Sequence, residues 1–150
     1  MSRSDGFFRY FHTVIISCYL LFSSPLLLAE QVIKSADYSI HYNAFNSSML
    51  SPEIAKQYDI ERSSSLGVIN IAVIKDGGKS VTALLQGNAK NAISQLKELK
   101  FQKITEGEAI YYIATFNFAD KEQVIFNIDV TPDGEMKTTR LEFKQQFFVG

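Results

Sequence analysis

The sequence predicts an all-β fold, an antiparallel immunoglobulin-like β-sandwich of about seven strands with one short helical insertion. Several segments alternate apolar and polar residues with a period of two, which is typical of half-buried strands. Turn motifs rich in Gly, Pro and Asp separate these segments, and no alternation of strands with long helices indicates a parallel sheet. The 150-residue chain contains twelve Phe and seven Tyr but no Trp, and such rings favour strands and fill thin cores. A lipocalin-like barrel is the alternative, but the chain is short for one.

Residues 1–29 differ in composition from the rest of the chain. Two arginines near the start precede an apolar run from Val14 to Phe22, and Ala29 is followed by polar residues. This order of basic, apolar and small residues is typical of a secretory signal peptide. We predict a signal peptide over residues 1–29, cleaved after Ala29, and a single β-sandwich domain over residues 30–150 in the periplasm.

Other interpretations of this N-terminal segment are weaker. An uncleaved membrane anchor is the main alternative, but the apolar run is shorter than the ~20 residues that span a bilayer, and Pro25 interrupts it. A lipoprotein anchored through Cys18 would keep an apolar segment after the modified cysteine. Cleavage would remove Cys18, the single cysteine, and with it any disulfide or thiolate nucleophile.

The first half of the domain contains a strand and a short helix. Over residues 38–45 the side chains of Tyr38, Ile40 and Tyr42 share one face of the predicted strand. Ser51 is a favourable N-cap, and the proline and glutamate that follow it are typical of a helix start.

A hairpin is predicted in the middle of the chain. Residues 68–74 are nearly all apolar and form a central strand, and Asp76-Gly77-Gly78 supplies the turn, because glycine reaches the positive φ that such turns need. Residues 81–86 form the return strand, which Gly87-Asn88 ends. Residues 91–104 fit either a short helix over 92–100 or a strand, and we favour the strand.

Two strong strands and a closing strand follow the turn at Gly107. In residues 109–118 and 124–130 every second residue is apolar, and in the latter segment the side chains of Asn127 and Asp129 face outward. A turn over residues 131–134 leads into the last strand, which is predicted over Met136–Val149.

Composition argues against several function classes. After residue 29 the chain carries thirteen basic and fifteen acidic residues, since Arg3, Arg9 and Asp5 lie before that point. No polybasic patch indicates nucleic-acid binding. One histidine and no cysteine argue against a transition-metal site, so we expect no metal and no cofactor. We expect membrane contact only through an uncleaved export signal.

Catalytic candidates are few, and we expect no enzyme. His41 lacks the activated serine that a triad needs. Glu106 and Glu108 could act as a carboxylate pair on sugars, but they flank a turn, where solvated acids are common. A small hydrolase using His41 or these glutamates is therefore an alternative, as is a purely structural envelope component.

A polar and aromatic segment supplies the candidate binding residues. Residues 42–50 combine asparagines and serines with a phenylalanine directly before the predicted helix. Asn-rich loops bind ligands and also close turns through side-chain bonds to the backbone. We predict that Tyr42, Asn43, Phe45 and Asn46 contact another envelope protein or a small ligand of unknown identity.

Several motifs resemble those of domain of unknown function family 4426. They include His41-Tyr42-Asn43-Ala44, Asn70-Ile71-Ala72-Val73, Glu106-Gly107 with Ala109-Ile110-Tyr111-Tyr112-Ile113, and the closing Phe143-Lys144-Gln145-Gln146-Phe147-Phe148-Val149. The resemblance covers nearly the whole chain after residue 29. It implies an exported proteobacterial protein with a compact β domain and no assigned activity, and it supplies no catalytic residue.

Overall fold

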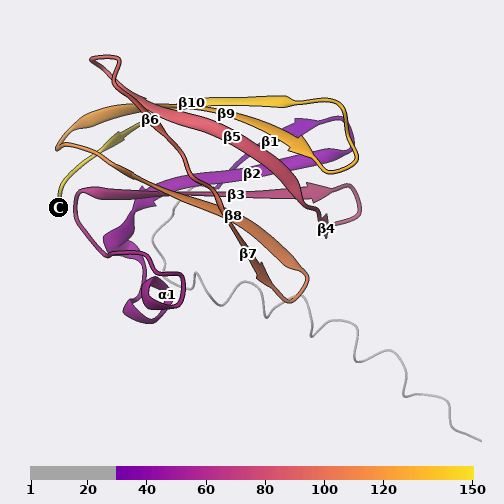
Figure 1. The fold of residues 1–150 in the computed structure, drawn as a ribbon, viewed down its shortest axis with the longest axis horizontal. Helices are drawn as coiled ribbons and strands as arrows, with labels where there is room; N and C mark the ends of the chain where they lie inside the picture. Colours follow the sequence, from indigo (N-terminus) through magenta and orange to yellow (C-terminus); the bar gives the residue numbers. More distant parts are fainter. Residues whose placement is uncertain (1–29) are drawn as a thin grey trace, which may run out of the picture.

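A computed structural model describes residues 30–150, which form two antiparallel sheets packed face to face (Figure 1). Sheet A has the strand order β1-β2-β3-β8-β7, and the short β4 pairs with β3. Its strands are β1 (Gln31–Ser35), β2 (Tyr38–Asn46), β3 (Leu66–Lys75), β4 (Lys79–Ser80), β7 (Gln102–Glu106) and β8 (Ala109–Asn117). Sheet B has the order β10-β9-β5-β6, made by β5 (Ala83–Asn91), β6 (Leu96–Glu98), β9 (Glu122–Pro132) and β10 (Thr139–Phe147). The predicted all-β sandwich is confirmed.

The described residues form ten strands rather than about seven. Two of the additional strands are the short β1 and β4. The third arises because residues 96–106 form two strands, β6 and β7, instead of one. The predicted signal peptide, residues 1–29, lies outside the described residues. Between residues 30 and 150 no helix is long and apolar enough to cross a membrane.

The core lies between the two sheets and follows from the period-two pattern. Alternate side chains of β2, β3, β8, β9 and β10 point inward and bury each other, because successive residues of a strand face opposite sides. Phe126 of β9 is fully buried, and its ring stacks on Phe143 at 4.6 Å and meets the edge of Phe116 at 5.0 Å. The inward faces predicted for residues 38–42, 109–118 and 124–130 are confirmed.

A second, smaller core lies on the outer face of sheet A. Here the helix α1 (Pro52–Gln57) covers Phe45 and Val68, and Leu50 and Ala55 complete the cluster. The predicted N-cap is confirmed, since the Ser51 Oγ accepts a hydrogen bond from the Ile54 N–H at 3.3 Å. Burial against the sheet stabilises a helix too short to be stable alone.

The prediction of a return strand over residues 81–86 is wrong in two respects, the strand with which it pairs and the residue at which it ends. Lys79–Ser80 pairs with β3 and the Val81 N–H donates to the Val73 carbonyl at 3.0 Å, after which the chain crosses to sheet B and continues as β5. Near the crossing the Ala83 N–H donates a 2.8 Å hydrogen bond to the Tyr112 hydroxyl of β8, which ties the two sheets together. Gly87-Asn88 does not end the strand, because both residues pair with β9 and β5 runs on to Asn91.

Residues 91–104 contain no helix, and the predicted strand is present over residues 96–98 and from residue 102 but not at Leu99 and Phe101. The strand is interrupted between β6 and β7, where the Leu99 side chain is buried in the core. The Leu99 N–H donates to the Gly87 carbonyl at 2.9 Å. The last strand is shorter than the predicted Met136–Val149. Met136 is fully exposed beside the turn at Gly134, and pairing with β9 begins at Thr139.

Candidate functional site

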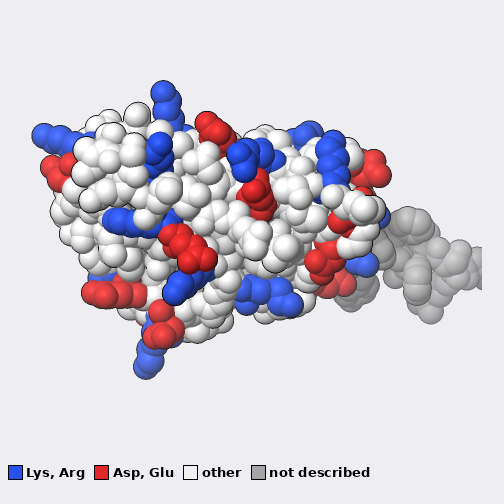
Figure 2. Space-filling view, turned by 45° about the horizontal axis from the view of Figure 1, so that its top comes forward, with Lys and Arg blue, Asp and Glu red and all other residues white. Residues whose placement is uncertain are grey.

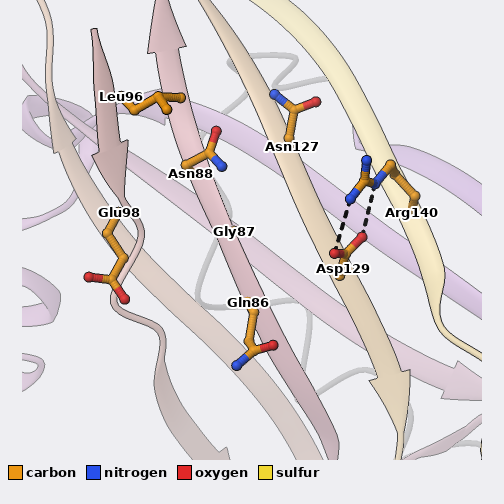
Figure 3. Close-up of a pocket in the computed structure, with 8 residues that line it drawn as sticks. All are labelled: Gln86, Gly87, Asn88, Leu96, Glu98, Asn127, Asp129 and Arg140. Carbon is orange, nitrogen blue, oxygen red and sulfur yellow. Dashed lines mark hydrogen bonds and ion pairs between the residues drawn. The ribbon is translucent and has the colours of Figure 1, made fainter.

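A depression of about 480 Å³ lies on the outer face of sheet B (Figure 3). Side chains from all four strands of the sheet line it, and most are polar. The lining residues are Gln86, Gly87, Asn88, Leu96, Glu98, Asn127, Asp129 and Arg140. The volume is in the range that small ligands occupy.

Strand register places these side chains together. Asn88 pairs with Asn127 of β9 on one side and with Glu98 of β6 on the other, so the three side chains form a row across the sheet. A second row joins Gln86, Asp129 and Arg140. Cross-strand partners have Cβ atoms about 5 Å apart, which is close enough for one ligand to contact neighbouring members of a row.

Gly87 lets β5 approach β9 closely at the floor of the depression. A Cβ at this position would lie 2.5 Å from the Asn127 carbonyl oxygen and 2.9 Å from the Ile128 Cα. Real Cβ atoms do not come this close to backbone, so only glycine fits without a shift of the strands.

The Asn88 side chain has an unsatisfied hydrogen-bond acceptor. Its Oδ1 is buried and has no hydrogen-bond partner within the described residues. Buried polar atoms are usually paired, and an unpaired one costs about 1–3 kcal/mol. A ligand donor would satisfy this oxygen once the Asn88 side chain turned it toward the depression.

An ion pair fixes one wall of the depression. The Arg140 guanidinium donates from Nε to the Asp129 Oδ1 at 3.0 Å and from a terminal nitrogen to Oδ2 at 3.2 Å. These hydrogen bonds hold the pKa of Asp129 below its ordinary value, and the carboxylate raises the pKa of Arg140. Both groups stay charged at neutral pH, and the bidentate geometry orients them.

The structure does not bring the four predicted binding residues onto one surface. Tyr42 points into the core between the sheets, where burial raises its pKa and its hydroxyl donates to Gln31 at 2.9 Å. Phe45 lies on the opposite face of β2, in the core beneath α1. The exposed fraction of Tyr42 is 6% and that of Phe45 is 3%.

The two asparagines of this set are half-buried and lie apart from the depression. Asn43 faces Asn70 across the β2–β3 pair of sheet A. Asn46 donates to the Ser64 carbonyl at 2.8 Å, and its Oδ1 accepts from the Ser48 N–H at 3.1 Å, so it caps the short helix η2 (Ser47–Met49). The role of these four residues as partner contacts stays a prediction.

The catalytic candidates are separated from each other. The His41 Nδ1 lies 3.2 Å from a carboxylate oxygen of Glu30. Glu106 and Glu108 flank the predicted turn between β7 and β8, and β3 and β8 separate them from β2. Three strand spacings of ~4.8 Å place them ~14 Å or more from His41. The part of the chain that the structure describes holds no group of three His, Cys, Asp or Glu residues that could bind a metal ion.

Sequence reasoning missed this depression because its residues are dispersed along the chain. The pattern did place Asn127 and Asp129 on the outward face of their strand, as the structure confirms. It gave no indication that β5 pairs with β9, since Gly87-Asn88 is predicted to end the strand. A strand interpretation of residues 83–91 would have brought Asn88 to the same face.

Comparison with known proteins gives the family. The model of the domain of unknown function DUF4426 matches residues 33–150. The chain is a member of the DUF4426 family. The crystal structure of a DUF4426 family protein from Pseudomonas aeruginosa PAO1 is similar, with 35% identity and a TM-score of 0.72 over 81% of this chain and 96% of that chain.

More distant structures share the fold of this DUF4426 chain. FetP from uropathogenic Escherichia coli, recombinantly expressed in the periplasm of E. coli, is 6% identical with a TM-score of 0.57 over 79% of this chain and 93% of FetP. A copper-bound FetP variant is 7% identical with the same TM-score, over 79% and 95% of the two chains. At this identity the likeness shows the fold alone. No curated protein matches the chain.

Proposed function

We propose that this DUF4426 chain is an exported binding module of the cell envelope and that the depression on sheet B is its ligand-binding surface. The observation that carries the proposal is a polar hollow lined by side chains of all four strands of sheet B, one of which, Asn88, has a buried side-chain oxygen without a hydrogen-bond partner. Ligand sites are concave, and a few convergent polar groups orient the ligand in them.

The N-terminal pattern supports a periplasmic location. Basic residues, an apolar run and Ala29 follow each other as in a cleaved signal peptide. A protein with the same fold, FetP, has been produced in the periplasm. A sandwich without cysteine after residue 29 is compatible with an oxidising compartment.

We propose binding rather than catalysis. The catalytic candidates His41, Glu106 and Glu108 lie on sheet A or in its β7–β8 turn, whereas the depression lies on sheet B. In the depression the ion pair of Asp129 with Arg140 keeps one carboxylate ionised, so it is poorly suited to donate a proton at neutral pH.

The copper of the FetP variant does not transfer to this chain. Copper sites in proteins use imidazole, thiolate and thioether ligands. After residue 29 the DUF4426 chain has one histidine, His41, and no cysteine. His41 is paired with Glu30 on sheet A, and the residues that line the depression include no histidine or methionine.

Photo-cross-linking in intact cells tests the proposed surface. A photoreactive amino acid replaces Gln86 at the depression, Met49 in the predicted 42–50 contact segment, or Lys79 at the start of β4 on sheet A. We expect an adduct from position 86 and none from position 79. Adducts from position 49 alone would reject the depression and favour the 42–50 segment.

A further inference from the structure

We infer that the depression binds an organic cation that carries a primary ammonium or guanidinium group. The inference rests on the proposed binding function and specifies its ligand. Two carboxylates and one guanidinium line the depression, so its side chains carry one net negative charge. The guanidinium of Arg140 is engaged by Asp129, which leaves Glu98 as the carboxylate without an ion pair among the described residues.

The two residues that carry the available acceptors lie on neighbouring strands. Glu98 and Asn88 are register partners of β6 and β5, and both side chains line the depression (Figure 3). Rotation about the soft Cβ–Cγ bond turns the unpaired Asn88 Oδ1 toward the depression. An ammonium group has three donors and no acceptor, so it can satisfy this oxygen and the Glu98 carboxylate together.

The wall beside these acceptors suits an alkyl chain. Leu96 lines the same depression and is 65% exposed, although it is a large apolar side chain. The methylene groups of an alkyl amine would cover it while the charged end meets Glu98, as lysine side chains do on protein surfaces. A ligand with an apolar stem and a cationic end therefore matches both sides of the hollow.

Charges around the depression do not favour an anion instead. Lys90 and Lys144 lie in the next row of the sheet, on either side of Ile125, and neither lines the depression. Basic and acidic side chains alternate over this side of the molecule without a patch of one sign (Figure 2). The local excess of hydrogen-bond acceptors therefore favours a ligand with a positive charge.

The experiment compares matched ligands by isothermal titration of the purified protein at low salt. Putrescine and butane-1,4-diol have the same carbon chain, but only putrescine is charged. We expect saturable binding of putrescine, weakened by salt, and no binding of the diol. Nα-acetyl-lysine amide, which is charged, and its neutral Nε-acetylated form make the same comparison for a lysine side chain. Tighter binding of the charged lysine compound than of putrescine would indicate that the natural ligand is a lysine of a protein.

Matched variants locate the binding. Glu98→Gln removes the charge in the depression, and Glu108→Gln makes the same change in the exposed turn after β7. We expect about three- to fivefold weaker putrescine binding by Glu98→Gln, typical of one exposed ion pair, and no change in Glu108→Gln. Equal losses in both variants, equal binding of the diol, or no binding of either amine would overturn the inference. If neither amine binds but position 86 still forms an adduct in cells, the depression is a binding surface for a different ligand.

Discussion

Replacement of Tyr112 by phenylalanine tests how the two sheets are joined. The substitution removes the hydroxyl that accepts the 2.8 Å hydrogen bond from the Ala83 N–H and keeps the buried ring. A buried donor left without its acceptor costs about 1–3 kcal/mol. Since Ala83 is only half-buried, water partly replaces the bond, and we expect the free energy of unfolding to fall by about 1–2 kcal/mol.

Urea denaturation measures this effect, with Tyr42→Phe as the control. The Tyr42 ring is equally buried, but its hydroxyl bonds to the side chain of the exposed Gln31, which can bond to water instead. We expect Tyr42→Phe to cost less than ~0.5 kcal/mol and both variants to keep the slope of the wild-type transition. Equal losses in the two variants, or no loss in Tyr112→Phe, would refute the proposed role of this hydrogen bond.

Three further substitutions have effects that follow from single contacts. Gly67→Ala would place a Cβ against the ring of Phe116 on the neighbouring strand, and we expect a loss of about 1–3 kcal/mol in urea denaturation. Ser47→Ala removes a fully buried hydroxyl that donates to the Ser63 carbonyl at 3.1 Å and accepts from its N–H at 2.9 Å, so thermal unfolding should show a loss of about 2–3 kcal/mol. The folded pKa of Asp129 is lowered, so its ion pair stabilises the protein above the ordinary pKa of 3.8 and loses this effect as pH falls through the folded value. Asp129→Asn should therefore cost up to ~1 kcal/mol at pH 7 and less at pH 2.

Each of these expectations has an internal control. A double variant with Phe116→Leu should recover part of the Gly67→Ala loss, and strictly additive losses would contradict a clash with the ring. Ser63→Ala keeps the backbone partners of Ser47 and should cost much less than Ser47→Ala. A difference between wild type and Asp129→Asn that persists unchanged at pH 2 would show that the ion pair is not its cause.

The strands with strict alternation could be predicted from the sequence. In β9 and β8 every second side chain is apolar, and burial of that set on one side of a sheet leaves a single register available. The helix α1 was equally predictable, because Ser51 and Pro52 specify its start locally. These features depend on neighbouring residues alone.

Features that depend on pairing between distant residues could not be predicted. Gly87 fits a turn in isolation, and only its approach to the Asn127 carbonyl explains a glycine within β5. The strand β1 has little apolar character of its own and forms because it pairs with β2. The depression needs the β5–β9 and β5–β6 registers at once, so no local pattern could have located it.

Chemical-shift mapping of the ¹⁵N-labelled protein tests the central claim that the depression is the ligand-binding surface. Unlabelled soluble envelope extract contributes no signals, so every change reports on this protein. The account predicts saturable changes at Gln86, Asn88, Glu98 and Asn127. Changes confined to Asn43 and the neighbouring residues of the 42–50 segment, or none at all, would contradict it.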